Sequence, residues 1–148
     1  MMQYIFVLCA PPGAGKTTFS HQCVEQYNAA RYSFDEMKCF KHSDLIKPII
    51  ASLNKGESVV VDALYSKIKY RKELLQAIED VNCKRILIYM NTPLEECIRR
   101  NAQRPNPLPE FMIRDIYNSI EPPTLDEGWD EIIYVKEDGT YEFNFTSD

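Results

Sequence analysis

Short apolar runs alternate along the chain with stretches in which apolar residues recur at helical spacing. Tyr4–Ala10 (YIFVLCA) is continuously apolar, which is typical of a strand buried on both faces of a parallel sheet. A loop over Pro11–Gly15 then leads into a helix predicted for Lys16–Tyr27. The remaining strands are predicted at Arg31–Phe34, Ser58–Asp62, Arg85–Met90 and Glu131–Val135.

Helical patterns separate these strands. They predict helices at Ser43–Lys55, Ile68–Val81, Pro93 to about Gln103, and Glu110–Ile120. After the last strand, the Asp138-Gly139 turn predicts a hairpin that continues through Thr140–Phe145. The alternation of strands and helices predicts a parallel α/β sandwich with right-handed crossovers, folded as a single domain over residues 1–148.

Composition favours a soluble protein and sets aside several classes. No apolar run approaches the roughly 20 residues that cross a bilayer. The apolar start lacks a basic leading segment and flows into a Gly-rich loop, so we do not interpret it as a signal peptide. The 5 cysteines are odd in number and never spaced C-x-x-C, which predicts reduced thiols and a cytoplasmic location. We expect His21 and His42 to lie on helix surfaces rather than to bind a metal.

The net charge of −5 is unevenly distributed. From Glu121 to the end there are nine Asp/Glu and one Lys, a balance of −8, so residues 1–120 carry a balance of +3. A mildly basic body permits a polyanionic substrate at a local site, and the overall charge argues against extended coating of DNA or RNA.

A phosphate-binding loop follows the first strand. Residues 10–17 (APPGAGKT) match G-x-x-x-x-G-K-[ST] except at Ala10, which needs a negative φ there. Glycines in such a loop let backbone N–H groups point at phosphate oxygens, and the next helix adds its positive end. Lys16 would reach the β- and γ-phosphates of ATP, and the Thr17 hydroxyl would bind Mg²⁺. The alternative is a Gly-rich turn with a chance lysine. The expected ATP-binding residues in this loop are Pro12, Gly13, Ala14, Gly15, Lys16, Thr17 and Thr18.

With these motifs the chain resembles the small P-loop kinases typified by polynucleotide 5′-hydroxyl kinases. Besides the loop, the resemblance rests on VVVDA after the third strand, on residues 99–104 (RRNAQR) and on residues 117–132 (YNSIEPPTLDEGWDEI). It spans Ile5 to about Val135 and implies a three-layer α/β/α sandwich whose five strands lie in the order 2-3-1-4-5. It also implies a small helical lid at about residues 99–112.

Asp35 is the expected catalytic base. It follows the second strand, so it should lie at the carboxyl edge of the sheet, where ligands bind in open α/β folds. A kinase acting on an alcohol needs a carboxylate that orients the hydroxyl and accepts its proton. The resemblance implies this role for Asp35 and makes Lys38 a contact to the phosphate beside the acceptor hydroxyl. The alternative for Asp35 is a helix N-cap.

Asp62 ends the apolar strand VVVD, as the carboxylate of a Walker B motif does. It could hold a Mg²⁺-bound water or an acceptor group, or cap the next helix. Nearby Tyr65 could stack on a base, or simply be a packed surface aromatic.

Arginines bracket the start of the predicted lid. Arg100 and Arg104 lie one helical turn apart, and the resemblance implies that both contact ATP phosphates and assist catalysis. The alternative is a solvated basic helix end, which suits Arg99 best. A second basic cluster opens the Ile68–Val81 helix, and we expect Arg71 from it to help bind the acceptor. The cluster consists of Lys67, Lys69, Arg71 and Lys72.

These features together predict a phosphotransferase that uses ATP and Mg²⁺. The expected acceptor is the 5′-hydroxyl of a nucleic-acid end. A small hydroxyl compound or an aminoacyl-tRNA is the alternative within the same fold. An ATP-binding switch module without catalysis is the alternative of another class, which Asp35 and the lid arginines disfavour. We expect no membrane association and no obligate protein partner.

Overall fold

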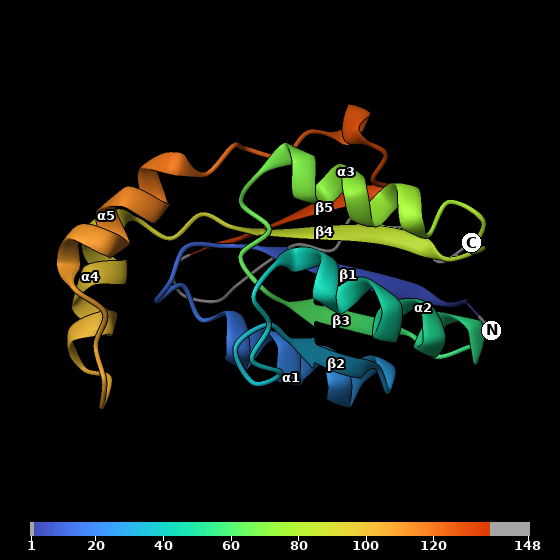
Figure 1. Cartoon of the computed structure of the whole chain (residues 1–148). Coiled ribbons are helices and arrows are strands. Elements are labelled where there is room, and N and C mark those ends of the chain that lie inside the picture. Colours follow the sequence, from blue (N-terminus) through green and yellow to red (C-terminus); the bar gives the residue numbers. More distant parts are fainter. Residues whose placement is uncertain (1, 137–148) are drawn as a thin grey trace.

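The structure is a computed structural model that describes residues 2–136. Five parallel strands form one sheet in the order β2-β3-β1-β4-β5, which confirms the order that the resemblance implied (Figure 1). Their bounds are Tyr4–Cys9 (β1), Ala30–Ser33 (β2), Val59–Asp62 (β3), Lys84–Met90 (β4) and Glu131–Val135 (β5). The predicted hairpin strand at Thr140–Phe145 lies outside the described residues.

Helices connect the strands close to where the sequence predicts them. The helix bounds are Lys16–Tyr27 (α1), Ile46–Asn54 (α2), Ile68–Ala77 (α3), Leu94–Ala102 (α4) and Glu110–Ser119 (α5), with short 3-10 helices at His42–Leu45 (η1) and Leu125–Glu127 (η2). No helix within residues 2–136 combines the length and apolarity needed to cross a bilayer.

Helix α3 ends four residues before the predicted Val81. The chain turns after Ala77, where the Val81 amide donates to the Ile78 carbonyl. The Arg85 guanidinium from β4 donates to the carbonyls of Ile78, Val81 and Cys83. These bonds satisfy carbonyls that a longer helix would have bonded internally, so the turn is stable in place of a further helical turn.

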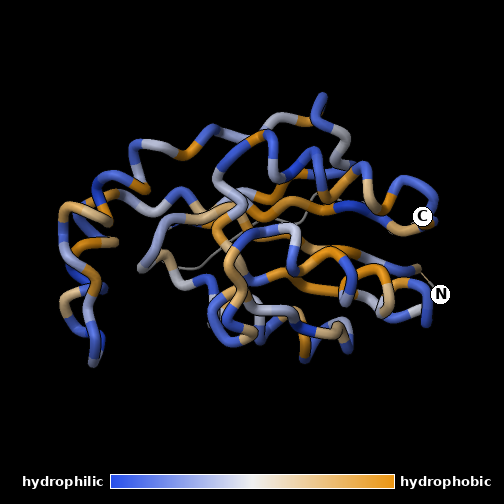
Figure 2. The backbone as a smooth tube through the Cα atoms, in the orientation of Figure 1, coloured by the Kyte–Doolittle hydropathy of each residue, from blue (hydrophilic) through white to orange (hydrophobic). Residues whose placement is uncertain are grey.

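The sheet carries a hydrophobic core on each face. Alternate residues such as Ile5 and Val7 pack with α2, α3 and Trp129 on one face. Their neighbours, such as Phe6 and Leu8, pack with α1 on the other face. In Figure 2 the apolar colour accordingly follows the central strands, while many residues of the peripheral segments are coloured hydrophilic. The molecule is therefore the predicted three-layer α/β/α sandwich.

The loops that follow β1, β2 and β3 meet at the carboxyl edge of the sheet. The strands run in parallel register, with Val7 beside Val61 and Ser33 beside Asp62. Figure 1 shows α4 and α5 projecting beyond this edge, past the loop that follows β1. The fold thus gathers the loop after β1, the turn after β2 and the helices α4 and α5 at one end.

Candidate active site

The loop between β1 and α1 leaves the start of α1 open for an anion. Gly15 precedes α1 in the left-handed region (φ 94°), and no side chain caps the helix. Gly13 also has a positive φ of 84°, and a Cβ there would lie 2.7 Å from the carbonyl oxygen of Cys97 in α4. The loop therefore needs glycine at position 13 both for its backbone and for its close packing on α4.

Ala10 departs from the loop consensus without strain. Its side chain is fully buried, and its amide donates to the carbonyl of Leu64 at 3.3 Å. The described non-glycine residues with positive φ are Asn28, Lys38 and Tyr65, so Ala10 keeps an ordinary backbone conformation. The missing first glycine leaves the shape of the loop intact.

Asp62 sits in a charged cluster behind the loop. One of its oxygens lies 3.5 Å from Nζ of Lys16. The other accepts hydrogen bonds from the Ser20 hydroxyl at 3.0 Å and from the Arg31 guanidinium at 2.6 Å. Asp62 is 3% exposed, so these cations compensate a carboxylate that would otherwise be costly to bury. Arg31 also pairs with Glu36 at 2.6 Å, beside Asp35.

Arg31 and Ser20 were not predicted as site residues. Arg31 lies in β2 and reaches Asp62 at the end of the neighbouring strand. Its importance depends on that pairing of strands, which no local motif reveals.

Asp35 lies in a turn directly after β2. Residues 34–38 form this turn, in which the Lys38 amide donates to the Asp35 carbonyl. No helix begins there, so the N-cap alternative is wrong. Asp35 is exposed and lines a cavity, and among residues 2–136 no partner hydrogen-bonds or ion-pairs with its carboxylate. Lys38 occupies the same turn, is exposed, and does not line the cavity.

The cavity joins the phosphate loop to the turn of Asp35. It has a volume of about 650 Å³. Lys16 and Thr17 line it on the loop side, and Asp35 lines it on the side of β2. Arg104 lines it from the loop that follows α4. The cavity thus brings together residues that were predicted to bind ATP and the residue predicted to be the catalytic base. The remaining wall is largely apolar, formed by Phe34, His42, Ala63, Leu64, Leu108 and Ile116.

His42 is part of this wall and not the surface residue that we expected. Its ring stacks on Tyr70 at 4.3 Å between centroids and meets the edge of Tyr65 at 4.7 Å. Phe34 lies 5.3 Å away on another side. Burial lowers the pKa of His42, which favours the neutral ring. Its place in the cavity depends on side chains from three segments, so spacing along the chain did not indicate it.

The lid arginines do not share a helix face, contrary to the prediction. Helix α4 ends at Ala102, so Arg104 lies in the following loop and turns into the cavity. Arg100 instead stays on α4, bonded to Glu96 at 2.9 Å and to the Gly13 carbonyl at 3.3 Å. The exposed Arg99 pairs with Glu96, as the alternative of a solvated helix end expects. The paired arginines lower the pKa of Glu96 to about 2, with hydrogen bonds from Arg99 as the largest cause.

Asn101 holds the loop that carries Arg104. It is 5% exposed. Its amide donates to the Leu108 carbonyl at 2.8 Å, and its carbonyl oxygen accepts from the Leu108 amide at 3.1 Å. These two bonds close the loop over residues 102–107 and fix Leu108 at the cavity wall.

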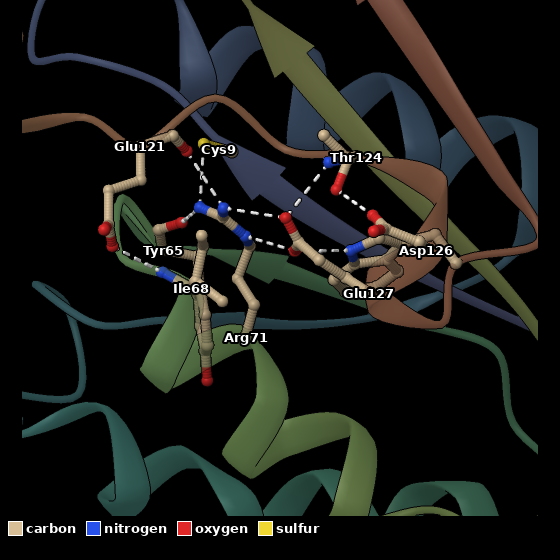
Figure 3. A network of polar contacts seen from close by, with 9 residues as sticks. Cys9, Tyr65, Ile68, Arg71, Glu121, Thr124, Asp126 and Glu127 are labelled. Atoms are coloured by element: carbon tan, nitrogen blue, oxygen red, sulfur yellow. Dashed lines mark hydrogen bonds and ion pairs between the residues drawn. The ribbon is translucent and has the colours of Figure 1, made fainter.

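Arg71 does not line the cavity, so the prediction that it helps bind the acceptor is wrong. Its side chain is fully buried and forms an ion pair with Glu127 at 2.8 Å (Figure 3). The guanidinium also donates to the carbonyls of Tyr65 and Glu121 and contacts the Cys9 sulfur. We call this set the Arg71 network. Arg71 thereby joins the end of β1, the loop after β3 and the segment that leaves the lid.

Tyr65 is also unavailable for stacking on a base, because it is fully buried. Its backbone has a positive φ of 40°, and Arg71 binds its carbonyl at 2.8 Å. Burial raises the pKa of its phenol, so the ring is a neutral part of the core.

Comparisons with known proteins agree with this architecture. A sugar kinase from Janibacter sp. HTCC2649 has a similar structure, with a TM-score of 0.73 and 15% identity, over 92% of this chain and 86% of the other. A gluconokinase from Sinorhizobium meliloti 1021 gives a TM-score of 0.62 at 15% identity, over 91% and 83% of the two chains. A fungal RNA kinase gives 0.67 at 22% identity, over 100% and 77% of the two chains.

Sequence comparison points the same way. The chain is 23% identical over 145 residues to an L-seryl-tRNA(Sec) kinase from Methanococcus maripaludis. That alignment covers 85% of this chain, which spans 56% of the length of that relative. A family model described as an AAA domain matches residues 5–123. The chain therefore belongs to this AAA domain family and has a fold like that of P-loop kinases.

Proposed function

We propose that the chain transfers the γ-phosphate of ATP to a hydroxyl group, and that this hydroxyl is the 5′ end of a polynucleotide. The acceptor oxygen forms a bond to the γ-phosphorus while the bond from that phosphorus to the bridging β,γ-oxygen breaks. The hydroxyl proton passes to the carboxylate of Asp35, and ADP leaves with the electron pair of the broken bond.

The observation that carries the proposal is the shared cavity of about 650 Å³. Lys16 and the start of α1 offer positive charge to phosphate at one side of it, while Asp35 offers a carboxylate at the other. Arg104 lines the same cavity from the loop that follows α4. A module that only binds ATP would need neither Asp35 nor Arg104 in that space.

The phosphate side supplies charge at fixed positions. Lys16 and the amides of residues 13–17 bind the β- and γ-phosphates, and Arg104 stabilises the charge that spreads over the transferred group. Thr17 is exposed to the cavity and fits a Mg²⁺ ion, which takes most of its ligands from phosphate and water. Asp62, already bound to Arg31, would act on that ion through water. The ion would neutralise charge on the phosphates.

The acceptor side favours a ligand with a flat apolar part. Phe34, His42 and Leu64 line the cavity together with Asp35, and Leu108 and Ile116 line it from the segment that contains α5. A pocket built for a sugar needs polar side chains to match many hydroxyls. A nucleobase suits rings and aliphatic walls better. The likeness to the fungal RNA kinase, which covers the whole of this chain, supports the same class.

A second candidate acceptor is an aminoacyl-tRNA. The observation in its favour is the 23% identity to an L-seryl-tRNA(Sec) kinase over 85% of this chain. This acceptor would also present a hydroxyl next to nucleotides, so it agrees with the apolar wall. The sugar kinase and gluconokinase share the fold at 15% identity, but the cavity wall outside the phosphate loop, Asp35 and Arg104 is largely apolar, which suits a sugar less well.

The test supplies ATP labelled at the γ-phosphate together with a panel of acceptors. The panel contains 5′-OH oligonucleotides, nucleosides, gluconate, simple sugars and seryl-tRNA, each with Mg²⁺. Labelled oligonucleotide is the expected product. The same preparation carrying Lys16→Ala gives the background, because it loses the phosphate contact while Arg31 still compensates the buried Asp62. Label only on gluconate or a sugar would overturn the polynucleotide assignment, and wild-type activity in folded Lys16→Ala would overturn the kinase mechanism.

A further inference from the structure

The turn that carries Asp35 continues into a loop that presents one aromatic ring to solvent. Phe40 is 97% exposed, the highest value among the exposed large hydrophobic residues of the described chain. Two residues close to it in the chain point inward: Cys39 packs against the core, and His42 lies in the ring cluster of the cavity wall. The path of the chain therefore keeps the Phe40 ring out of the core. His42, two positions further along the chain, lines the cavity.

The loop that holds Phe40 is ordered by its own hydrogen bonds. The Asp44 carboxylate accepts from the amides of Phe40 at 3.0 Å and Lys41 at 3.2 Å. The Cys39 amide donates to the Phe34 carbonyl at 3.1 Å. A ring held outward on a fixed loop loses little entropy when it stacks on a ligand, and an exposed Phe is costly unless something covers it.

The loop carries an exposed lysine on each side of the ring, Lys38 and Lys41. Among the nearby acids, Asp35 faces the cavity, Glu36 is paired with Arg31, and Asp44 accepts hydrogen bonds from the amides of Phe40 and Lys41. The two lysine side chains can therefore contact a phosphodiester backbone that passes the ring.

We propose that Phe40, flanked by Lys38 and Lys41, is a stacking site for a single-stranded nucleic-acid segment that adjoins the acceptor hydroxyl. The reacting nucleotide occupies the cavity beside Asp35, and the adjacent base stacks on Phe40 outside it. Stacking on an aromatic side chain tolerates any base, and lysines next to it contact the backbone phosphates. The inference rests on the proposed function and narrows it to acceptors longer than one nucleotide. Figure 1 places this loop at the same end of the molecule as the lid.

The test measures binding without catalysis, by fluorescence anisotropy of labelled nucleic acids in the absence of ATP. One arm uses a 5′-OH hexanucleotide, and the other an aminoacylated RNA hairpin with a single-stranded 3′ end. Phe40→Ala should weaken binding of the 5′-OH hexanucleotide by at least about fivefold. Tyr134→Ala is the matched control, because it removes another exposed ring at the opposite edge of the sheet. It should bind as the wild type does. Lys41→Ala should flatten the dependence of log K on log salt by about 0.7, the value for one lost phosphate contact with a single strand.

The arm that depends on Phe40 identifies the source of the strand. Equal binding by wild type and Phe40→Ala, or no binding of either nucleic acid, would overturn the inference. Failure of the stacking site can be distinguished from failure of the proposed kinase reaction. Phosphorylation of the oligonucleotide without dependence on Phe40 would remove only the stacking site. Binding that depends on Phe40 without phosphotransfer would remove only the proposed reaction.

Discussion

Asp35 is the single side chain on which the proposed chemistry turns. We predict that Asp35→Asn lowers turnover by roughly 10²–10⁴-fold, because the amide cannot accept the proton of the hydroxyl. ATP affinity should not change, since the phosphate contacts lie on the other side of the cavity. Stability should also be kept, because Asp35 is exposed and begins no helix. Steady-state kinetics, an ATP titration and a thermal melt check this; a variant that keeps most of its turnover would remove Asp35 from the mechanism.

Replacing Arg104 should lower turnover much more than replacing Arg99, because the two side chains lie in different surroundings. Arg104 lines the cavity, whereas Arg99 is paired with Glu96 on the outside of α4. We predict that Arg104→Ala lowers turnover at least about tenfold, the scale of one charge-assisted contact in the transition state. Arg99→Ala should change it less than about twofold, as expected for an exposed ion pair. Single-turnover rates of the two variants provide the comparison, and equal losses would contradict the assignment of Arg104.

At the scale of elements, the contact between the phosphate loop and α4 depends on one missing Cβ. We predict that Gly13→Ala destabilises the protein by about 1–3 kcal/mol, since alanine is strained at φ 84° and its Cβ would meet the Cys97 carbonyl at 2.7 Å. ATP affinity should fall as well. Urea unfolding and an ATP titration measure the two effects.

Gly56→Ala separates the two causes of that loss. Gly56 has nearly the same φ, 85°, but a Cβ there would have no heavy atom within 4 Å. Its loss of stability should therefore report the backbone strain alone, about 1 kcal/mol, with ATP affinity unchanged. If both glycine variants lost the same stability and bound ATP equally, the packing of α4 on the loop would not matter.

Elements and side chains were not equally predictable from the sequence. The apolar runs and the glycine loop are local signals, so α1 and β5 begin and end where the pattern predicted them. The order of the strands came from the resemblance, because spacing alone does not define it. The predictions for Arg71 and His42 were wrong because both residues depend on contacts between distant parts of the chain. The partner of Arg71 lies 56 residues away, and the cavity wall around His42 comes from separate segments. Such contacts exist only in the folded chain, and the roles proposed for the cavity residues stay predictions.

At the scale of the whole molecule, the reactivity of the 5 cysteine thiols reports how well the folded core excludes solvent. All are free, and Cys39 alone among them is not buried. Burial raises the pKa of Cys9 to about 11 and that of Cys23 to about 12, so little of either exists as the reactive thiolate. We predict that the native protein is alkylated at one thiol and the unfolded protein at five, counted by mass spectrometry. Cys39→Ser should abolish the native reaction, and rapid native labelling of further thiols would show that the core opens.

The Arg71 network has a consequence for how the chain could be divided. A cut in the lid loop at residues 103–109 would give two fragments. The second fragment would carry β5, which pairs along β4 from Glu131 to Val135. It would also carry Glu127 and Glu121, whose oxygens accept hydrogen bonds from Arg71 of the first fragment. A backbone ladder and a buried ion pair would thus connect the fragments without a covalent link, so the two halves could be produced separately and joined as a split protein.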